Sequence, residues 1–144
     1  MNTSKVIREL EQKYTGKKIV KNQEENPTEI LCEVEPTKEH PDHSLAIAVI
    51  DKSIPHVHKK TTEVYRIIKG KLKLYVDEKV INLNEEDKYE IEAGRVHWAE
   101  GKETWLECYS KPGWTFEDYI LIDHNKFAVS TYENGVSHLF LVNN

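Results

Sequence analysis

The sequence predicts an all-β fold, an antiparallel sandwich or barrel, preceded by one short helix. Three observations support this prediction. Short runs rich in Val, Ile, Leu and Tyr recur about every 8–12 residues, Gly, Asn and Asp separate many of these runs, and helical periodicity is hard to find after residue 14. The length of 144 residues suits a single domain.

The first segment, residues 3–14, is predicted to form an amphipathic helix because its apolar residues recur at a spacing of four: Val6, Leu10 and Tyr14. Thr3 or Ser4 is available as the N-cap, and Gly16 lies just past the expected end. Residues 22–27 are polar and are expected to form a connector.

The remaining chain is predicted to consist of short strands. They are expected at residues 28–34, 44–51, 63–68, 71–76, 79–83, 88–91, 95–99, 104–110, 118–123 and 137–142. The run 44–51 is apolar on both faces, so we expect it to be a central strand that is covered on both sides.

Charge and composition exclude several classes of function. The net charge is -5, with 20 basic and 25 acidic residues, and no dense basic stripe is present, so nucleic acid is not an expected partner. The longest apolar stretch, residues 45–50, is too short to span a bilayer, and residues 1–14 lack the apolar core of a signal peptide. We therefore expect no membrane association and a cytoplasmic location. Cys32 and Cys108 are expected to be buried thiols rather than a disulfide framework.

The most informative segment contains two histidines at alternate positions. His56 and His58 point to the same side if this segment is a strand, and two adjacent imidazoles are a natural pair of ligands for a divalent transition metal. Glu63 opens the next strand and is able to return a carboxylate to the same place. The full pattern is H-x-H-x4-E-x6-G followed by G-x-x-H, and it comprises His56, His58, Glu63, Gly70, Gly94 and His97.

This pattern resembles the two sequence motifs of the cupin family, and the resemblance covers residues 44–111. The first motif is matched in full, whereas in the second Glu92 stands at the proline position and Gly101 at the asparagine position. The resemblance implies a double-stranded β-helix (jelly-roll) barrel. It also implies one divalent first-row transition metal ion (Fe, Mn, Ni, Zn or Co), held by the residues His56, His58, Glu63 and His97. Such a ligand set leaves one or two coordination positions open.

On this basis we expect one cupin domain over residues 1–144. It would comprise an N-terminal helix and connector (1–27), the barrel (28–123) and a C-terminal extension (124–144). Since cupins commonly pair by sheet packing, a homodimer is also expected.

Further site residues are predicted from the alternation of side chains along a strand, since residues two apart point to the same face. Tyr65 and Ile67 share the parity of Glu63, so we expect them to line the barrel above the metal and to contact a substrate. On strand 104–110 parity leaves two alternatives. If Trp105 and its face point inward, Glu107 and Tyr109 are candidate catalytic acid–base groups; if the opposite face does, both lie on the surface.

Two other features have a functional and a structural interpretation. The loop 112–118 is either a lid over the barrel mouth or a segment anchored by Trp114 in a small separate core. The remaining histidines are expected to be surface or local hydrogen-bonding groups: His40, His43, His124 and His138.

The resemblance permits two classes of function. The first is a metal-dependent enzyme, an isomerase or epimerase or else a dioxygenase, that acts on a small polar metabolite such as a sugar. The alternative is a non-catalytic module that binds a small molecule or a metal. The chain contains three arginines, which argues against a phosphorylated or strongly anionic substrate.

Overall fold

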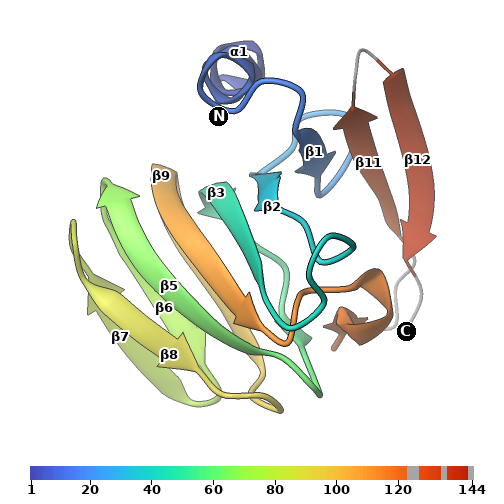
Figure 1. The fold of residues 1–144 in the computed structure, drawn as a ribbon. Helices are drawn as coiled ribbons and strands as arrows, with labels where there is room; N and C mark the ends of the chain where they lie inside the picture. Colours follow the sequence, from blue (N-terminus) through green and yellow to red (C-terminus); the bar gives the residue numbers. More distant parts are fainter. Residues whose placement is uncertain (123–126, 134–135, 143–144) are drawn as a thin grey trace.

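The computed structural model describes residues 1–122 in full and, beyond them, the backbone of two strands at residues 127–133 and 136–142. The chain is mostly β, with one N-terminal α-helix, as the sequence predicts (Figure 1). In chain order the elements are α1 (Thr3–Lys13), β1 (Lys18–Lys21), β2 (Glu29–Glu35), β3 (Ser44–Lys52), β4 (His56–Val57), β5 (Thr62–Lys69), β6 (Leu72–Val76), β7 (Lys79–Leu83), β8 (Lys88–Ile91), β9 (His97–Lys111), the short 3-10 helix η1 (Phe116–Asp118), β10 (Ile120–Leu121), β11 (Phe127–Glu133) and β12 (Val136–Val142).

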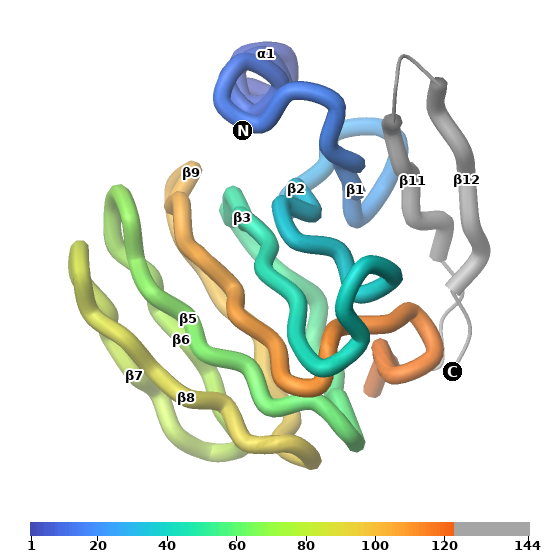
Figure 2. The backbone as a smooth tube through the Cα atoms, viewed as in Figure 1, coloured from blue at the N-terminus to red at the C-terminus, as the bar shows by residue number. Residues whose placement is uncertain are grey.

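The strands pair in antiparallel fashion in the order β10-β4-β9-β3-β2-β1-β11-β12. The long strand β9 also pairs with β5 and β6, and these two continue into β8 and β7 respectively. Figure 2 shows the result, a sheet that curls around on itself into a half-barrel. The predicted all-β architecture is therefore confirmed in the form of a curled antiparallel sheet.

Strand β9 is one continuous element where the sequence predicts two strands. The separation was expected around Gly101, but the backbone there forms a bulge instead, with a register shift against β3 between Ile50 and Lys52. The Thr104 hydroxyl lies inside the bulge and donates to the carbonyl of Lys71 at 2.5 Å. A bulge lets a strand bend without losing its pairing on either side, so β9 is able to line both ends of the half-barrel.

Three further elements differ from the prediction. Strands β1 and β11 are not predicted from the sequence, and they pair with each other. The strand expected over 118–123 is reduced to β10, at Ile120–Leu121, because residues 116–118 form η1. The end of that expected strand, together with His124, lies outside the described residues, as does the side chain of His138.

Helix α1 covers the outer face of the sheet. Asn2, rather than Thr3 or Ser4, is its N-cap, and the side chain of Asn2 accepts a hydrogen bond from the amide of Lys5 at 3.2 Å. The buried side chains of the helix, Val6 and Leu10, pack with a cluster from the sheet that comprises Ile19, Ile30, Cys32, Ile47, Val49 and Trp105. Eleven residues are too few to cross a bilayer, and no helix in the described part of the chain has the length and apolar character of a membrane span.

The inner face of the curled sheet holds a second apolar core, which includes Ala48, Ile50, Ile67, Leu74 and Leu106. Strand β3 contributes to both cores, as its two apolar faces predict. Cys32 and Cys108 are both buried and unpaired, which confirms their prediction as free thiols.

Candidate metal centre

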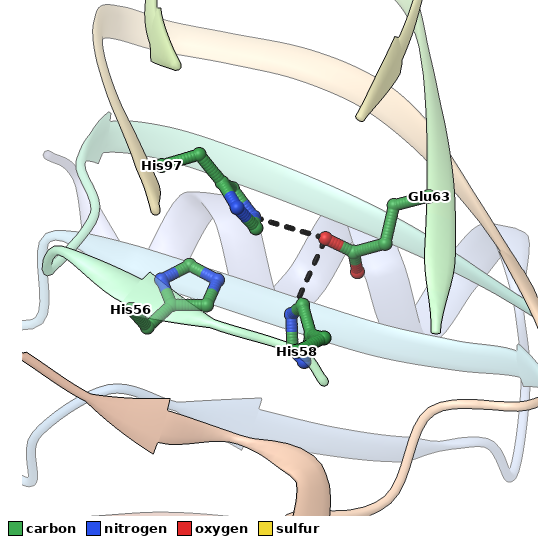
Figure 3. A group of neighbouring side chains, drawn as sticks. All are labelled: His56, His58, Glu63 and His97. Carbon is green, nitrogen blue, oxygen red and sulfur yellow. Dashed lines mark hydrogen bonds and ion pairs between the residues drawn. The ribbon is translucent and has the colours of Figure 1, made fainter. Parts of the chain in front are cut away.

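Strand pairing brings the predicted ligands together at the inner face of the half-barrel. His56 in β4 lies directly opposite His97 in β9, and Glu63 in β5 lies opposite Ser110 at the other end of β9. His58 follows β4 on the same side as His56. Figure 3 shows the four side chains pointing toward one another from these separate segments.

The four side chains form a compact, buried group. The Glu63 Oε1 atom lies 3.1 Å from Nε2 of His97 and 3.3 Å from Nε2 of His58. The ring of His56 has its centroid 4.2 Å from that of His97 and 4.9 Å from that of His58. One ligand atom from each of the four residues lies within 4.8 Å of the others, and all four side chains are at most 5% exposed.

Each imidazole also forms a hydrogen bond through Nδ1 with a backbone carbonyl. The Nδ1 atoms of His56, His58 and His97 lie 2.6, 2.8 and 3.1 Å from the carbonyl oxygens of Ile54, Asp118 and Arg95. Since a carbonyl oxygen only accepts, Nδ1 carries the proton in each ring. The second nitrogen, Nε2, is thereby left to act as a ligand, which is the usual arrangement at metal-binding histidines.

The carboxylate of Glu63 is positioned by two residues of β9. Its Oε2 atom accepts from Sγ of Cys108 at 3.1 Å and from the hydroxyl of Ser110 at 3.4 Å. These contacts orient the carboxylate so that Oε1 points at the histidines. The inner face of β9 therefore provides one ligand, His97, and fixes another.

The turn between His58 and Glu63 is shaped by Asp118. The Asp118 carboxylate accepts hydrogen bonds from the amides of Lys59, Lys60 and Thr61 at 2.9, 3.0 and 3.1 Å. Because the Asp118 carbonyl also accepts from His58, this one residue holds both the turn and the ring. On the other side, the amide of Gly94, whose φ of 88° suits glycine, donates to the carbonyl of His58 at 2.7 Å.

The electrostatics of the cluster favour a bound cation. Burial, together with the neighbouring His97 and His58, lowers the pKa of His56 well below its usual value. Burial also acts to lower the pKa of His58, but the Glu63 carboxylate outweighs it and raises that pKa. Although burial opposes ionisation of Glu63, the contacts with His58 and His97 hold its pKa well below the usual range.

The donor set fits a first-row transition metal. Three imidazole nitrogens and one carboxylate oxygen suit iron, manganese, nickel, cobalt and zinc. Ligand atoms about 2.1 Å from an ion lie roughly 3–4 Å from one another, close to the spacing found here. Two Nε2 lone pairs facing one carboxylate oxygen repel it unless a proton or a metal ion lies between them, and a divalent ion would remove this repulsion.

Of the predicted substrate-contacting residues, the structure brings one to the site. Tyr65 lines the cavity beside the cluster, with its ring centroid 6.4 Å from that of His97. Ile67 is 0% exposed and packs in the inner apolar core, so the prediction of a substrate contact for it is not supported. The two residues share a face, but Ile67 lies farther along β5 among close-packed neighbours.

The candidate catalytic pair on β9 lies on the opposite face from the metal ligands. Leu106, Cys108 and Ser110 point inward, so the second of the two alternatives for this strand is the observed one. Glu107 forms an ion pair with Arg66, with Oε1 2.5 Å from Nη2, and Tyr109 is 40% exposed. The prediction that Glu107 and Tyr109 move protons at the metal is therefore corrected: the sheet separates them from it.

Residues other than Glu107 and Tyr109 line the cavity beside the metal ligands. Glu29 and Leu31 of β2 line it, as do Trp114, Phe116 and Tyr119 from the segment after β9. The loop after β9 thus contributes to the wall of the site. Phe116 and Tyr119 also pack against the small separate core of Val20 and Leu121. Trp114, the expected anchor, lines the cavity instead.

Glu29 differs from the other cavity residues in its ionisation. Burial and the negative charge of Glu63 raise its pKa from 4.5 to about 7. The alternation of β2, in which Glu29 and Glu33 flank apolar Ile30 and Cys32, could have drawn attention to it. That pattern normally indicates a solvent-facing polar side, and here the polar side faces the cavity because α1 covers the other side.

A second group of potential ligands lies outside the cavity. His43 Nε2 is 3.3 Å from a Glu35 carboxylate oxygen, and His40 Nδ1 lies 2.9 Å from the carbonyl of His43. His40 and His43 are thus partly exposed local hydrogen-bonding groups, as predicted. Together with Glu35 they could also hold an ion, so any measurement of metal content has to distinguish the two groups.

Comparison with solved structures identifies similar folds of low sequence identity. Pac13, described as a nucleoside dehydratase, has a TM-score of 0.60 and 9% identity, covering 66% of this chain and 78% of its own. KdgF from Halomonas sp. has a TM-score of 0.55 and 17% identity, with coverage of 62% and 85%. Ectoine synthase from P. lautus has a TM-score of 0.54 and 16% identity, with coverage of 65% and 71%. At these identities the similarity shows the fold alone.

Comparison of sequences gives the family. No curated protein sequence matches the chain significantly. The profile of the cupin domain matches residues 30–104, which include all four positions of the first motif and the whole G-x-x-H motif. Over this range lie all four residues of the buried cluster. The chain belongs to the cupin domain family.

Proposed function

We propose that this protein is a metal-dependent enzyme that catalyses proton transfer on a small polar molecule, as an isomerase, an epimerase or a related enzyme. The observation that carries the proposal is the arrangement of the three histidines, each anchored through Nδ1, with Nε2 of His58 and of His97 directed at Glu63. A divalent ion at this cluster would polarise a substrate oxygen as a Lewis acid.

The group proposed to move the proton is Glu29. Its carboxylate lines the same cavity as His56, His58 and Glu63, and its pKa of about 7 allows it both to accept and to donate a proton near neutral pH. Tyr65 and Tyr119 are less suited to act as bases, because burial raises the pKa of both phenols and keeps them protonated. They are able to donate hydrogen bonds to a bound oxygen.

Two structural neighbours are described as enzymes of small polar molecules, a nucleoside dehydratase and an ectoine synthase. Solved structures of Streptomyces Pac13 contain uridine. These relatives support a small-molecule substrate for this chain. The substrate itself, the metal among Fe, Mn, Ni, Zn and Co, the homodimer and the cytoplasmic location stay predictions.

The first test is the metal content of purified, tag-free protein. We expect about one first-row transition metal ion per chain, and we expect His58→Ala to lose it because the variant removes a ligand. His43→Ala is the matched control, since it removes one imidazole from the outer group and should keep the ion. A wild-type protein without metal above neutral pH, or an ion lost from His43→Ala and kept in His58→Ala, would contradict the assignment.

The second test separates proton transfer from oxygen chemistry. Metal-loaded protein is incubated with aldoses and ketoses in D2O without oxygen, and deuterium incorporation is followed by NMR. We expect metal-dependent exchange that Glu29→Gln abolishes while it retains the ion. In a parallel assay with oxygen present, metabolite-dependent oxygen uptake by protein that shows no exchange would select a dioxygenase. Stoichiometric sugar binding without either reaction would select the non-catalytic module.

A further inference from the structure

The cavity above the metal cluster has a distinctive charge. It is an open space of about 850 Å³, including its mouth, with His56, His58 and Glu63 at its base. Two more carboxylates line it, those of Glu29 and Glu33, whereas no lysine or arginine occurs among its described lining residues. With a divalent ion bound, the charge of the ion exceeds that of Glu63 by one unit, and an ionised Glu29 balances that unit. Glu33 lies opposite Lys18 in the pairing of β1 with β2, so its charge is not counted here.

The two extra carboxylates point into the cavity because of the alternation of β2. Ile30 and Cys32 are buried beneath α1, so the residues between and beside them face the other way. The position of Glu29 is fixed by Asn22, whose side-chain oxygen accepts from the amides of Thr28 and Glu29 at 3.0 and 3.1 Å. Asn22 is itself buried, so this start of β2 is held firmly at the cavity.

The carboxylate of Glu29 makes no hydrogen bond or ion pair with the side chains in the fully described range 1–122. Glu29 is partly buried in the cavity wall. Even partial removal of a carboxylate from water without a partner has a free-energy cost, and a donor from a ligand would lower that cost. An ammonium or hydroxyl group meets this need, whereas a second anion increases the repulsion. The nearby ammonium of Lys18 lies 5.7 Å from the centroid of the Phe116 ring and does not line the cavity.

Another part of the cavity wall is aromatic. Trp114 and Phe116 contact each other edge to face, with ring centroids 4.6 Å apart, and Tyr119 stands 4.7 Å from the ring of His56. The Trp114 segment is fixed to the sheet, since its amide donates to the hydroxyl of Ser44 at 2.9 Å. Aromatic faces favour both apolar groups and cations.

We infer that the cavity selects a small cationic or uncharged molecule over an anionic one, with an ammonium or hydroxyl donor at Glu29 and a metal-binding atom at the histidine cluster. This inference rests on the proposed function for the metal-bound end of the ligand. It disfavours a ligand that would place a phosphate or a second carboxylate beside Glu29.

The test uses three probes that share one metal-binding group and differ in the charge of a short tail. They are N-(aminopropyl)imidazole, N-propylimidazole and N-(carboxyethyl)imidazole, each of which offers one ring nitrogen to the metal while its tail points away. Binding to Co²⁺-loaded protein is followed by the visible absorption of the ion at about pH 8, where the amine is charged and Glu29 ionised. We expect the aminopropyl probe to bind about tenfold more tightly than the carboxyethyl probe, with the propyl probe between them.

Two variants with the same change in charge test whether the preference for the cationic probe arises at Glu29. Glu29→Gln should reduce the ratio between the cationic and anionic probes to less than about threefold. Glu90→Gln, on exposed β8, removes the same charge far from the cavity and should preserve the wild-type ratio. If Glu29→Gln unfolds, the wild-type ratio is measured at low and high salt instead, and it should shrink as salt screens the carboxylates.

Each outcome separates the inference from the proposed function. If none of the probes changes the Co²⁺ spectrum, the metal has no open position and the proposed function fails. If all three change the spectrum with equal affinity, or the carboxyethyl probe binds best, the metal centre stands and the charge selectivity is overturned. A cation preference that Glu29→Gln leaves unchanged overturns the role of Glu29.

Discussion

At the scale of single residues, every histidine of the cluster is held at Nδ1, and two of the three are also held at Nε2. A backbone carbonyl accepts a hydrogen bond from Nδ1 of each ring. The shared carboxylate of Glu63 faces Nε2 of His58 and of His97. This double constraint sets the ring orientation before an ion arrives, so little conformational entropy is lost on binding. Because binding an ion displaces the proton that His58 gains beside Glu63, metal affinity should fall at acid pH.

Glu29 gives a prediction for the stability of the metal-free protein. Its pKa is raised on folding, from 4.5 to about 7, so the folded state binds the proton more tightly than the unfolded state. Its contribution to stability is therefore fully present below about pH 4.5 and is lost as the pH rises through about 7.

In EDTA, the free energy of unfolding of the wild type should fall relative to that of Glu29→Gln by about 1–3 kcal/mol over this interval. Urea unfolding at a series of pH values measures the difference, and Glu90→Gln provides the baseline. A difference between wild type and Glu29→Gln that stays constant, or that grows in favour of the wild type with rising pH, would show that Glu29 is not the buried titrating group.

At the scale of elements, local spacing predicts the ligands well. Alternation places His56 and His58 on one side of β4, and one turn then brings Glu63 to the same place. These relations depend on few residues, so the sequence suffices to predict them. The φ angles of Gly70 and Gly94, 93° and 88°, lie in the left-handed region that favours glycine, which gives a physical reason for the two glycines of the motifs.

The alternation of side chains along a strand does not identify the inward-facing side where the sheet has apolar residues on both faces. On β9, Trp105 is buried beneath α1 and Leu106 is buried inside the half-barrel, so hydrophobicity alone does not identify the inner face. Hydrogen-bond partners distinguish the two faces. Glu107 accepts from Arg66 on the outer face, and Cys108 donates to Glu63 on the inner face. These contacts join residues about 40 positions apart, and strand spacing carries no information on such pairs. Glu29 was missed for a different reason: a polar face of a strand normally faces solvent, and only the position of α1 on the other face of β2 turns it toward the cavity.

The segment around η1 gives a prediction about ligand positioning. Asp118→Ala removes the acceptor for three amides of the turn 59–61 and loosens the carbonyl that holds His58. We expect the dissociation constant for the metal to rise about 10–100-fold, as measured by competition with a chromophoric chelator. Glu117→Ala, at the exposed neighbouring residue, should leave it unchanged. Equal affinities in the two variants would mean that Asp118 does not position the ligand.

The bulge in β9 explains why Gly101 stands at the asparagine position of the second motif. A Cβ atom at residue 101 would lie 2.5 Å from the Thr104 hydroxyl and 2.9 Å from the carbonyl oxygen of Ile50. Gly101→Ala should therefore lower the free energy of unfolding by about 1–3 kcal/mol. Lys102→Ala, at an exposed position of the same bulge, is the control. If both variants melt at the wild-type temperature, the bulge has room that the contacts do not indicate.

At the scale of the whole molecule, the cluster connects parts of the sheet that are distant in the sequence. β4, β5 and β9 each contribute a ligand, and Asp118 joins the segment after β9 to the same centre. A bound ion therefore links both ends of the half-barrel, and its binding energy adds to the stability of the fold. The cavity above it is shaped by β2 and by the aromatic segment, which determine what reaches the metal.

The most direct measurement is anomalous diffraction at the absorption edge of the metal found in the purified protein. We predict one strong peak per chain inside the half-barrel, about 2.0–2.3 Å from Nε2 of His56, His58 and His97 and from a carboxylate oxygen of Glu63. A peak between Glu35, His40 and His43 with none at the buried cluster, or no peak in crystals of protein that contains metal, would contradict the assignment of this cluster as the metal centre.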